Sequence, residues 1–121
     1  MDDNLIEFIE YSLDSVWSLE LLLTLRQQPQ RTWSADELVA DLRSSRVVVR
    51  KSIDRLLASG LVVTDADDSV RYAPASPDQD KLVGKLAEAY RVRPAAIRRI
   101  ILRHSSDQLR TFAEAFKIMK G

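Results

Sequence analysis

The chain of 121 residues contains no cysteine, one histidine, three glycines and four prolines. Without cysteine it has no disulfide framework and no thiolate metal site. A lone histidine, His104, makes neither a catalytic triad nor a metal centre. The sequence also lacks a glycine-rich phosphate loop and any apolar run near the ~18 residues of a membrane span. These absences predict a protein that is not an enzyme, uses no cofactor or metal and has no membrane partner.

The scarcity of glycine and proline, with 45% hydrophobic and 30% charged residues, indicates a compact and mostly helical domain rather than a disordered chain. The sequence begins MDDN, which is acidic where a secretory signal is basic. The expected location is therefore the cytoplasm.

The formal net charge is zero, but the charges are segregated along the chain. Residues 1–25 carry six acidic side chains and no lysine or arginine, whereas residues 91–121 carry eight cations and two carboxylates. Such asymmetry is typical of a surface that binds nucleic acid or an acidic partner. It is equally typical of two terminal segments that pack together, within one chain or across a dimer.

Apolar residues at helical spacing predict helices over most of the chain, and two short β-prone runs predict a hairpin. Ser34 and Glu37 have the spacing of a capping box, as do Ser76 and Gln79. Gly60 is placed to end the helix before it in the left-handed conformation. The expected elements are apolar helical stripes at 5–9 and 16–23, a helix after Ser34, a helix within 44–60, strands at 61–64 and 70–73, and helices at 76–90, 93–104 and 105–120.

The segment SADELVADLRSSRVVVRKSIDRLLASGLV, residues 34–62, resembles the MarR- and PadR-like transcriptional regulators. The resemblance lies in the Ser-x-x-Glu-Leu that opens one helix and in the residues that end the next, Leu56, Gly60, Leu61 and Val62. It implies a winged helix-turn-helix fold, mostly α with a small β-hairpin. The expected units are an N-terminal helix (1–13), the winged-helix domain (14–75) and a C-terminal helical extension (76–121). The implied function is a transcriptional regulator that binds double-stranded DNA as a homodimer.

The helix within residues 44–60 is the expected recognition helix. At ~100° per residue, its buried side carries Val49, Ile53, Leu56 and Leu57, while Val47 is exposed and Val48 lies between. Its cations suit phosphates and guanine edges, and serines at its start suit phosphates. The predicted DNA-binding residues are Ser44, Ser45, Arg46, Val47, Arg50, Lys51, Arg55 and Arg71.

The predicted hairpin turn favours a different function. Asp65, Asp67 and Asp68 would repel phosphates, and Arg71 is the only cation near them. Three adjacent carboxylates without an EF-hand frame indicate a solvated turn rather than a metal loop. The alternative hypothesis is a winged-helix module that binds a protein partner through Val47, Val48 and the acidic turn, without DNA.

The terminal segments are expected to form the dimer. Residues 105–119 carry an apolar stripe that must be buried on the N-terminal helix of the same chain or of a second copy. Burial of two phenylalanines contributes more than exposed ion pairs, so the apolar stripe decides the stability. The predicted dimer-interface residues are Leu5, Ile9, Leu109, Phe112 and Phe116.

Overall fold

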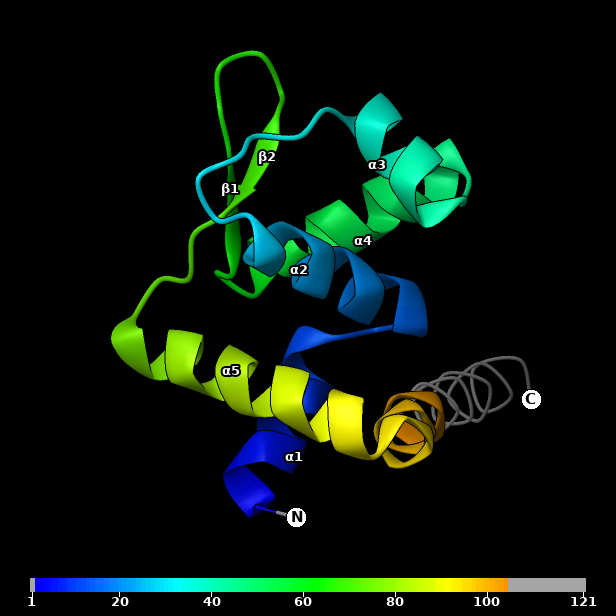
Figure 1. Cartoon of the computed structure of the whole chain (residues 1–121), viewed down its shortest axis with the longest axis vertical. Coiled ribbons are helices and arrows are strands. Elements are labelled where there is room, and N and C mark those ends of the chain that lie inside the picture. The colour runs from blue at the N-terminus through cyan, green and yellow to red at the C-terminus, as the bar shows by residue number, and fades with distance from the viewer. Residues whose placement is uncertain (1, 105–121) are drawn as a thin grey trace, which may run out of the picture.

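A computed structural model describes residues 2–104 of the chain. The described part is mostly helical and has one small antiparallel hairpin (Figure 1). Its elements are α1 (Asp3–Ser12), α2 (Val16–Gln27), α3 (Ala35–Leu42), α4 (Arg46–Ala58), β1 (Val62–Thr64), β2 (Val70–Tyr72) and α5 (Pro77–Val92), followed by helical residues 94–104.

Serine side chains begin four of these helices. Ser15, Ser34, Ser45 and Ser76 are the N-caps of α2, α3, α4 and α5, and each hydroxyl accepts a hydrogen bond from a backbone N–H in the first turn. The predicted capping box of Ser34 and Glu37 is confirmed. The hydroxyls satisfy N–H groups that have no partner within the helix.

Only one of the two hydrogen bonds of the predicted Ser76–Gln79 capping box forms, so this prediction is wrong in part. The Ser76 hydroxyl does accept from the Gln79 N–H. The Gln79 side chain, however, accepts from the Ala75 N–H at 3.0 Å and donates to the Ser59 carbonyl at 3.1 Å. It therefore joins the start of α5 to the end of α4, where Gly60 has a φ of 74° as predicted.

The hairpin pairs Val62 with Tyr72 and Thr64 with Val70. Trp33, in the segment before α3, forms an isolated bridge to Val70 and so adds a third short extended segment. The turn of the hairpin contains Asp68 with a φ of 68°, a left-handed conformation that Asp and Asn tolerate better than most residues.

The core lies around α2, which crosses the middle of the molecule (Figure 1). The helices α3 and α4 and the hairpin lie on one side of α2, whereas α1, α5 and residues 94–104 lie on the other. Leu19, Leu22 and Leu25 of α2 share one hydrophobic cluster with fully buried side chains from both sides; these include Ile9, Leu38, Leu56, Leu86, Ile97 and Ile101. Within residues 2–104, no helix combines the length and apolar character needed to span a membrane.

The side of α4 that is buried is turned slightly about the helix axis from the side that the sequence predicted. Val49, Ile53 and Leu56 are buried as expected, and Val47 is exposed as expected. Leu57 is partly exposed, and Ser52 is buried in its place. The rotation follows from α1, which packs its end against the side of α4 that carries Ser59 and Arg55.

Candidate functional site

Helix α4 and the hairpin lie on the same side of α2 (Figure 1). They are joined by an ion pair in which the Arg50 guanidinium lies 3.5 Å from the Asp68 carboxylate. This surface contains Arg46, Val47, Arg50 and Lys51 of the predicted DNA-binding residues of α4, together with the acidic turn.

The start of α4 is fixed by its serines. The Ser45 hydroxyl accepts from the Val48 N–H at 3.1 Å, and the Ser44 N–H donates to the Val39 carbonyl at 3.2 Å. The Ser45 hydroxyl proton remains able to donate, since capping uses only the oxygen as acceptor. A phosphate near this helix start would meet that hydroxyl and the positive end of the helix dipole.

The arginines of the surface are paired with carboxylates of the same chain. Arg46 pairs with Asp36 of α3, and Arg71 lies 3.6 Å from Asp65 across the base of the turn. With the Arg50–Asp68 pair, three predicted DNA-binding cations are neutralised locally. Lys51 is exposed and makes no ion pair within the described part of the chain.

Arg55, a predicted DNA-binding residue, is placed differently. Its guanidinium donates to the carbonyl oxygen of Tyr11 at the end of α1, and its Nε is buried without a hydrogen-bond partner. Next to it, the Ser59 hydroxyl donates to the Ser12 carbonyl at 3.2 Å. Arg55 therefore holds α4 against α1, a contact that was not predicted for this candidate DNA-binding residue.

The sequence contained a signal for this contact. Ser52, Arg55 and Ser59 follow one another at i, i+3 and i+7, which places them on one side of α4 beside the buried residues. Polar residues in such a row can bond to the carbonyls that a neighbouring helix leaves unpaired at its end.

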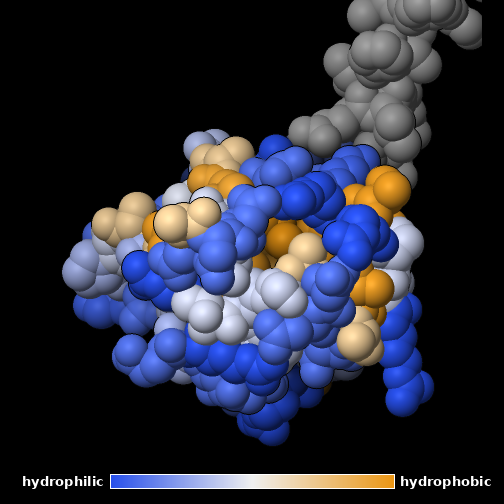
Figure 2. All heavy atoms as spheres, turned by 90° about the horizontal axis from the view of Figure 1, so that it is seen from above, coloured by the Kyte–Doolittle hydropathy of each residue, from blue (hydrophilic) through white to orange (hydrophobic). Residues whose placement is uncertain are grey.

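Apolar side chains on this surface are few. Val47 is the most exposed of the three valines, with 76% of its surface accessible, whereas Val49 is 1% exposed. Figure 2 shows this end of the molecule from above: it is mostly hydrophilic, and its apolar side chains form small separate groups. A surface of this kind suits a polar ligand better than a large apolar interface.

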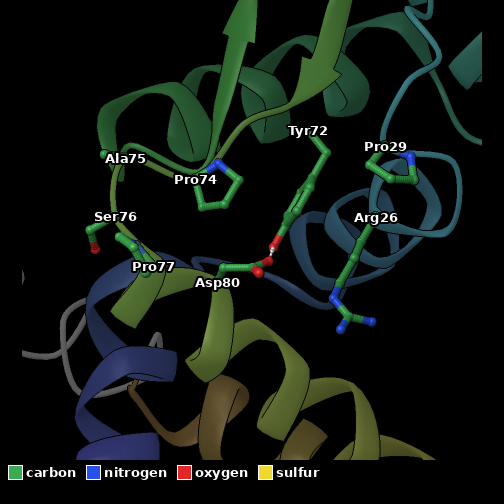
Figure 3. A pocket seen from close by; sticks show the side chains of 8 residues that line it. All are labelled: Arg26, Pro29, Tyr72, Pro74, Ala75, Ser76, Pro77 and Asp80. Atoms are coloured by element: carbon green, nitrogen blue, oxygen red, sulfur yellow. Dashed lines mark hydrogen bonds between the residues drawn. The ribbon is translucent and has the colours of Figure 1, made fainter.

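Beside the hairpin, a cleft of about 660 Å³ lies between α2, β2 and the start of α5 (Figure 3). On one wall the Tyr72 hydroxyl donates to the Asp80 carboxylate at 2.6 Å. Burial, and then the hydrogen bond to Asp80 and its charge, hold the pKa of Tyr72 well above its ordinary value. The bond ties the hairpin to α5, and no sequence motif pointed to it.

Arg26 forms the opposite wall of the cleft. One nitrogen of its guanidinium lies so close to Gly84 of α5 that a Cβ added there would be 3.2 Å away. A side chain at position 84 would therefore require this guanidinium to move by a few tenths of an ångström. Glycine at this helical position leaves room for the guanidinium, although glycine within a helix lowers the stability.

The predicted dimer residues divide into two sets. Leu5 and Ile9 are 4% and 0% exposed in the single chain, where they belong to its core. A dimer formed through these two side chains would have to exchange α1 between copies. Leu109, Phe112 and Phe116 lie outside the described residues.

His104 and the acidic side chains were the other candidates for catalysis or metal binding. His104 lies with its Nδ1 3.1 Å from the Glu10 carboxylate of α1. Among residues 2–104, no three His, Asp or Glu side chains are grouped so as to hold a metal ion, the acidic turn included.

Comparisons of this chain with protein-family models, with curated proteins and with solved structures found no match.

Proposed function

We propose that the chain is a DNA-binding regulator of the winged-helix type that acts as a homodimer, with α4 as its recognition helix and the hairpin as its wing. The order α2, α3, α4, β1, β2 supports the proposal, since it is the order implied by the resemblance of residues 34–62 to MarR- and PadR-like regulators. The observation that carries it is the single surface formed by the exposed side of α4 and the hairpin turn.

The side chains available to DNA lie in the first two turns of α4. Arg46, Arg50 and Lys51 are all exposed, and Val47 between them can contact a thymine methyl group. Arg46 and Arg50 have the fork geometry for guanine edges, whereas Lys51 and the Ser45 hydroxyl suit phosphates. In this orientation the N-terminal part of the recognition helix meets base edges, as in other helix-turn-helix proteins.

The local ion pairs reduce the affinity for DNA without preventing it. An exposed pair contributes about 0–1 kcal/mol, because water and salt screen both charges. The pairs of Arg46 and Arg50 are exposed on both partners, so a phosphate can replace the carboxylate at little cost. The carboxylates left behind still repel the DNA, and binding is therefore expected to be weak per chain and steeply salt-dependent.

The proposal is tested by charge reversal on α4. Arg50→Glu with Lys51→Glu is expected to abolish binding to a mixed-sequence duplex in fluorescence anisotropy, with the fold unchanged because neither side chain is buried. The single variant Lys51→Glu has a matched control in Lys81→Glu, which makes the same change of charge on α5. Both lysines are exposed on helices. Equal affinity of wild type and the α4 double variant would overturn the proposal.

A second candidate function is a module that binds a protein partner through the same surface without DNA. It is favoured by the neutralised arginines and by the exposure of Val47. Binding through Val47 would respond little to salt, whereas DNA binding falls steeply as salt rises. Titration at two salt concentrations separates the two functions.

A further inference from the structure

Val47 is the most exposed large apolar side chain among residues 2–104, with 76% of its surface accessible. It is the second residue of α4, whereas Val49, two positions later, is buried in the core. A valine at an exposed helical position adds no packing, and its β-branched side chain favours a helix less than alanine does. The fold therefore gives no reason for a valine at position 47.

Arginines flank Val47 without covering it. Arg46 precedes it and Arg50 follows one turn later, and both are exposed. Arg46 pairs with Asp36 of α3. Arg50 lies 3.5 Å from Asp68 of the hairpin turn, so the two guanidinium groups are held by different elements. Val47 thus stays accessible between two cations that suit guanine edges.

We infer that Val47 makes the α4 surface selective for pyrimidines that carry a methyl group at C5, namely thymine and 5-methylcytosine. This selectivity rests on the proposed function and adds the feature of DNA that the same surface distinguishes. In the major groove the C5 methyl is the apolar part of a base edge, whereas the other groups there are hydrogen-bond donors and acceptors. A valine side chain neither donates nor accepts a hydrogen bond. The methyl group is therefore the part of the groove that Val47 binds favourably.

The position of Val47 on α4 suits such a contact. In helix-turn-helix proteins the N-terminal residues of the recognition helix contact base edges, and nearby side chains reach successive base pairs. An arginine beside Val47 then places a guanine next to the methyl-bearing pyrimidine, because arginine pairs with the O6 and N7 atoms of guanine. Methylation of a cytosine beside a guanine should consequently strengthen binding.

The size of the effect follows from the burial of one methyl group. Removing one such group from water changes the affinity about fourfold. The change should not depend on salt, because no phosphate contact is gained or lost with the methyl group. Charge reversal at Arg50 and Lys51 acts through phosphates and salt instead, so the two effects can be told apart.

The test begins with sequences that the wild-type protein selects from a pool of random duplexes. In a selected duplex each thymine is replaced in turn by deoxyuridine, which keeps the base pair and lacks the methyl group. Each cytosine is replaced in turn by 5-methylcytosine, which adds one. Fluorescence anisotropy should show, at one position of the site, binding about fourfold weaker with deoxyuridine or about fourfold tighter with 5-methylcytosine. The replacement that has an effect identifies the base.

Two alanine variants show whether Val47 causes this response. Val47→Ala should reduce the response to less than about twofold, because the shorter side chain leaves the methyl group in contact with water. Val92→Ala makes the same substitution at an exposed valine at the end of α5 and should keep the full response. Neither valine is buried, so both variants should fold.

The outcomes separate this inference from the proposed function. A wild type that responds to neither replacement, a Val47→Ala variant that responds as strongly as wild type, or a selection that yields no preferred sequence would overturn the inference. The proposed function survives each of these results if Arg50→Glu with Lys51→Glu still abolishes binding. A wild type that binds no duplex would overturn both.

Discussion

Asp68 limits the affinity of the α4 surface for DNA, if the proposed function is correct. Its carboxylate lies 3.5 Å from Arg50 and on the same surface as the cations of α4. Asp68→Asn removes this charge and leaves Arg50 free to bind a phosphate. Asparagine is the suitable replacement because position 68 has a positive φ, which Asn tolerates and Ala does not.

The magnitude follows from the geometry of the pair. At this separation two unit charges in water interact with about 1 kcal/mol, and exposed pairs measure about 0.2–1 kcal/mol. Releasing Arg50 is therefore worth up to about a fivefold gain in affinity. If Arg50 then neutralises one more phosphate, the slope of log K against log salt becomes steeper by about 0.9.

Asp67→Asn is the matched control. Asp67 lies in the same turn and accepts a hydrogen bond from the Ser69 N–H, which an amide oxygen also accepts. This variant removes the same charge but releases no cation, so its effect on affinity should be the smaller one. Fluorescence anisotropy with a mixed-sequence duplex at several salt concentrations measures both quantities. Equal effects of the two variants, or weaker binding by Asp68→Asn, would refute the reasoning that the pair restrains Arg50.

Three further predictions concern stability. Val49→Ala should lower the free energy of unfolding by about 1–2 kcal/mol, whereas Val47→Ala should change it by less than about 0.5 kcal/mol, as urea titration would show. Arg55→Gln should lower the free energy of unfolding by about 0.5–1.5 kcal/mol in the same titration, because the exposed hydrogen bond to the Tyr11 carbonyl is lost, and should leave the affinity for DNA within about twofold. The raised pKa of Tyr72 means that the native state resists ionisation of this side chain. The un-ionised side chain contributes fully to stability below about pH 10, the ordinary pKa of tyrosine, and this contribution is lost as the pH rises above it. Above about pH 10 the midpoint temperature of thermal unfolding should therefore fall more steeply with pH for wild type than for Tyr72→Phe.

The local signals in the sequence predicted the helices and their ends well. Ser34 with Glu37 and the glycine at position 60 act through neighbouring backbone atoms, so their effect is contained in a few residues of sequence. The exposure of Val47 and burial of Val49 followed from helical geometry alone.

Contacts between distant segments could not be predicted in the same way. Arg55 meets Tyr11 across 44 positions, and Tyr90 donates to Glu20 across 70 positions, so both contacts depend on the tertiary arrangement. The pairing of Arg50 with Asp68 is the instructive case: both charges were evident, but the sequence did not reveal that they neutralise each other.

The ion pairs on the α4 surface limit the affinity with which a single chain can bind DNA. Four cations at most, Arg46, Arg50, Lys51 and Arg71, can reach phosphates from one wing and one recognition helix. Contacts of that number give the weak, salt-sensitive affinity of non-specific binding, about 10⁻⁴–10⁻⁶ M. A regulator gains useful affinity from such a unit when a second unit is tethered to it, because the second binding event is then intramolecular. The homodimer that we propose would supply such a tether, so a variant that no longer dimerises should lose most of its affinity for a two-site duplex while keeping its affinity for a single site.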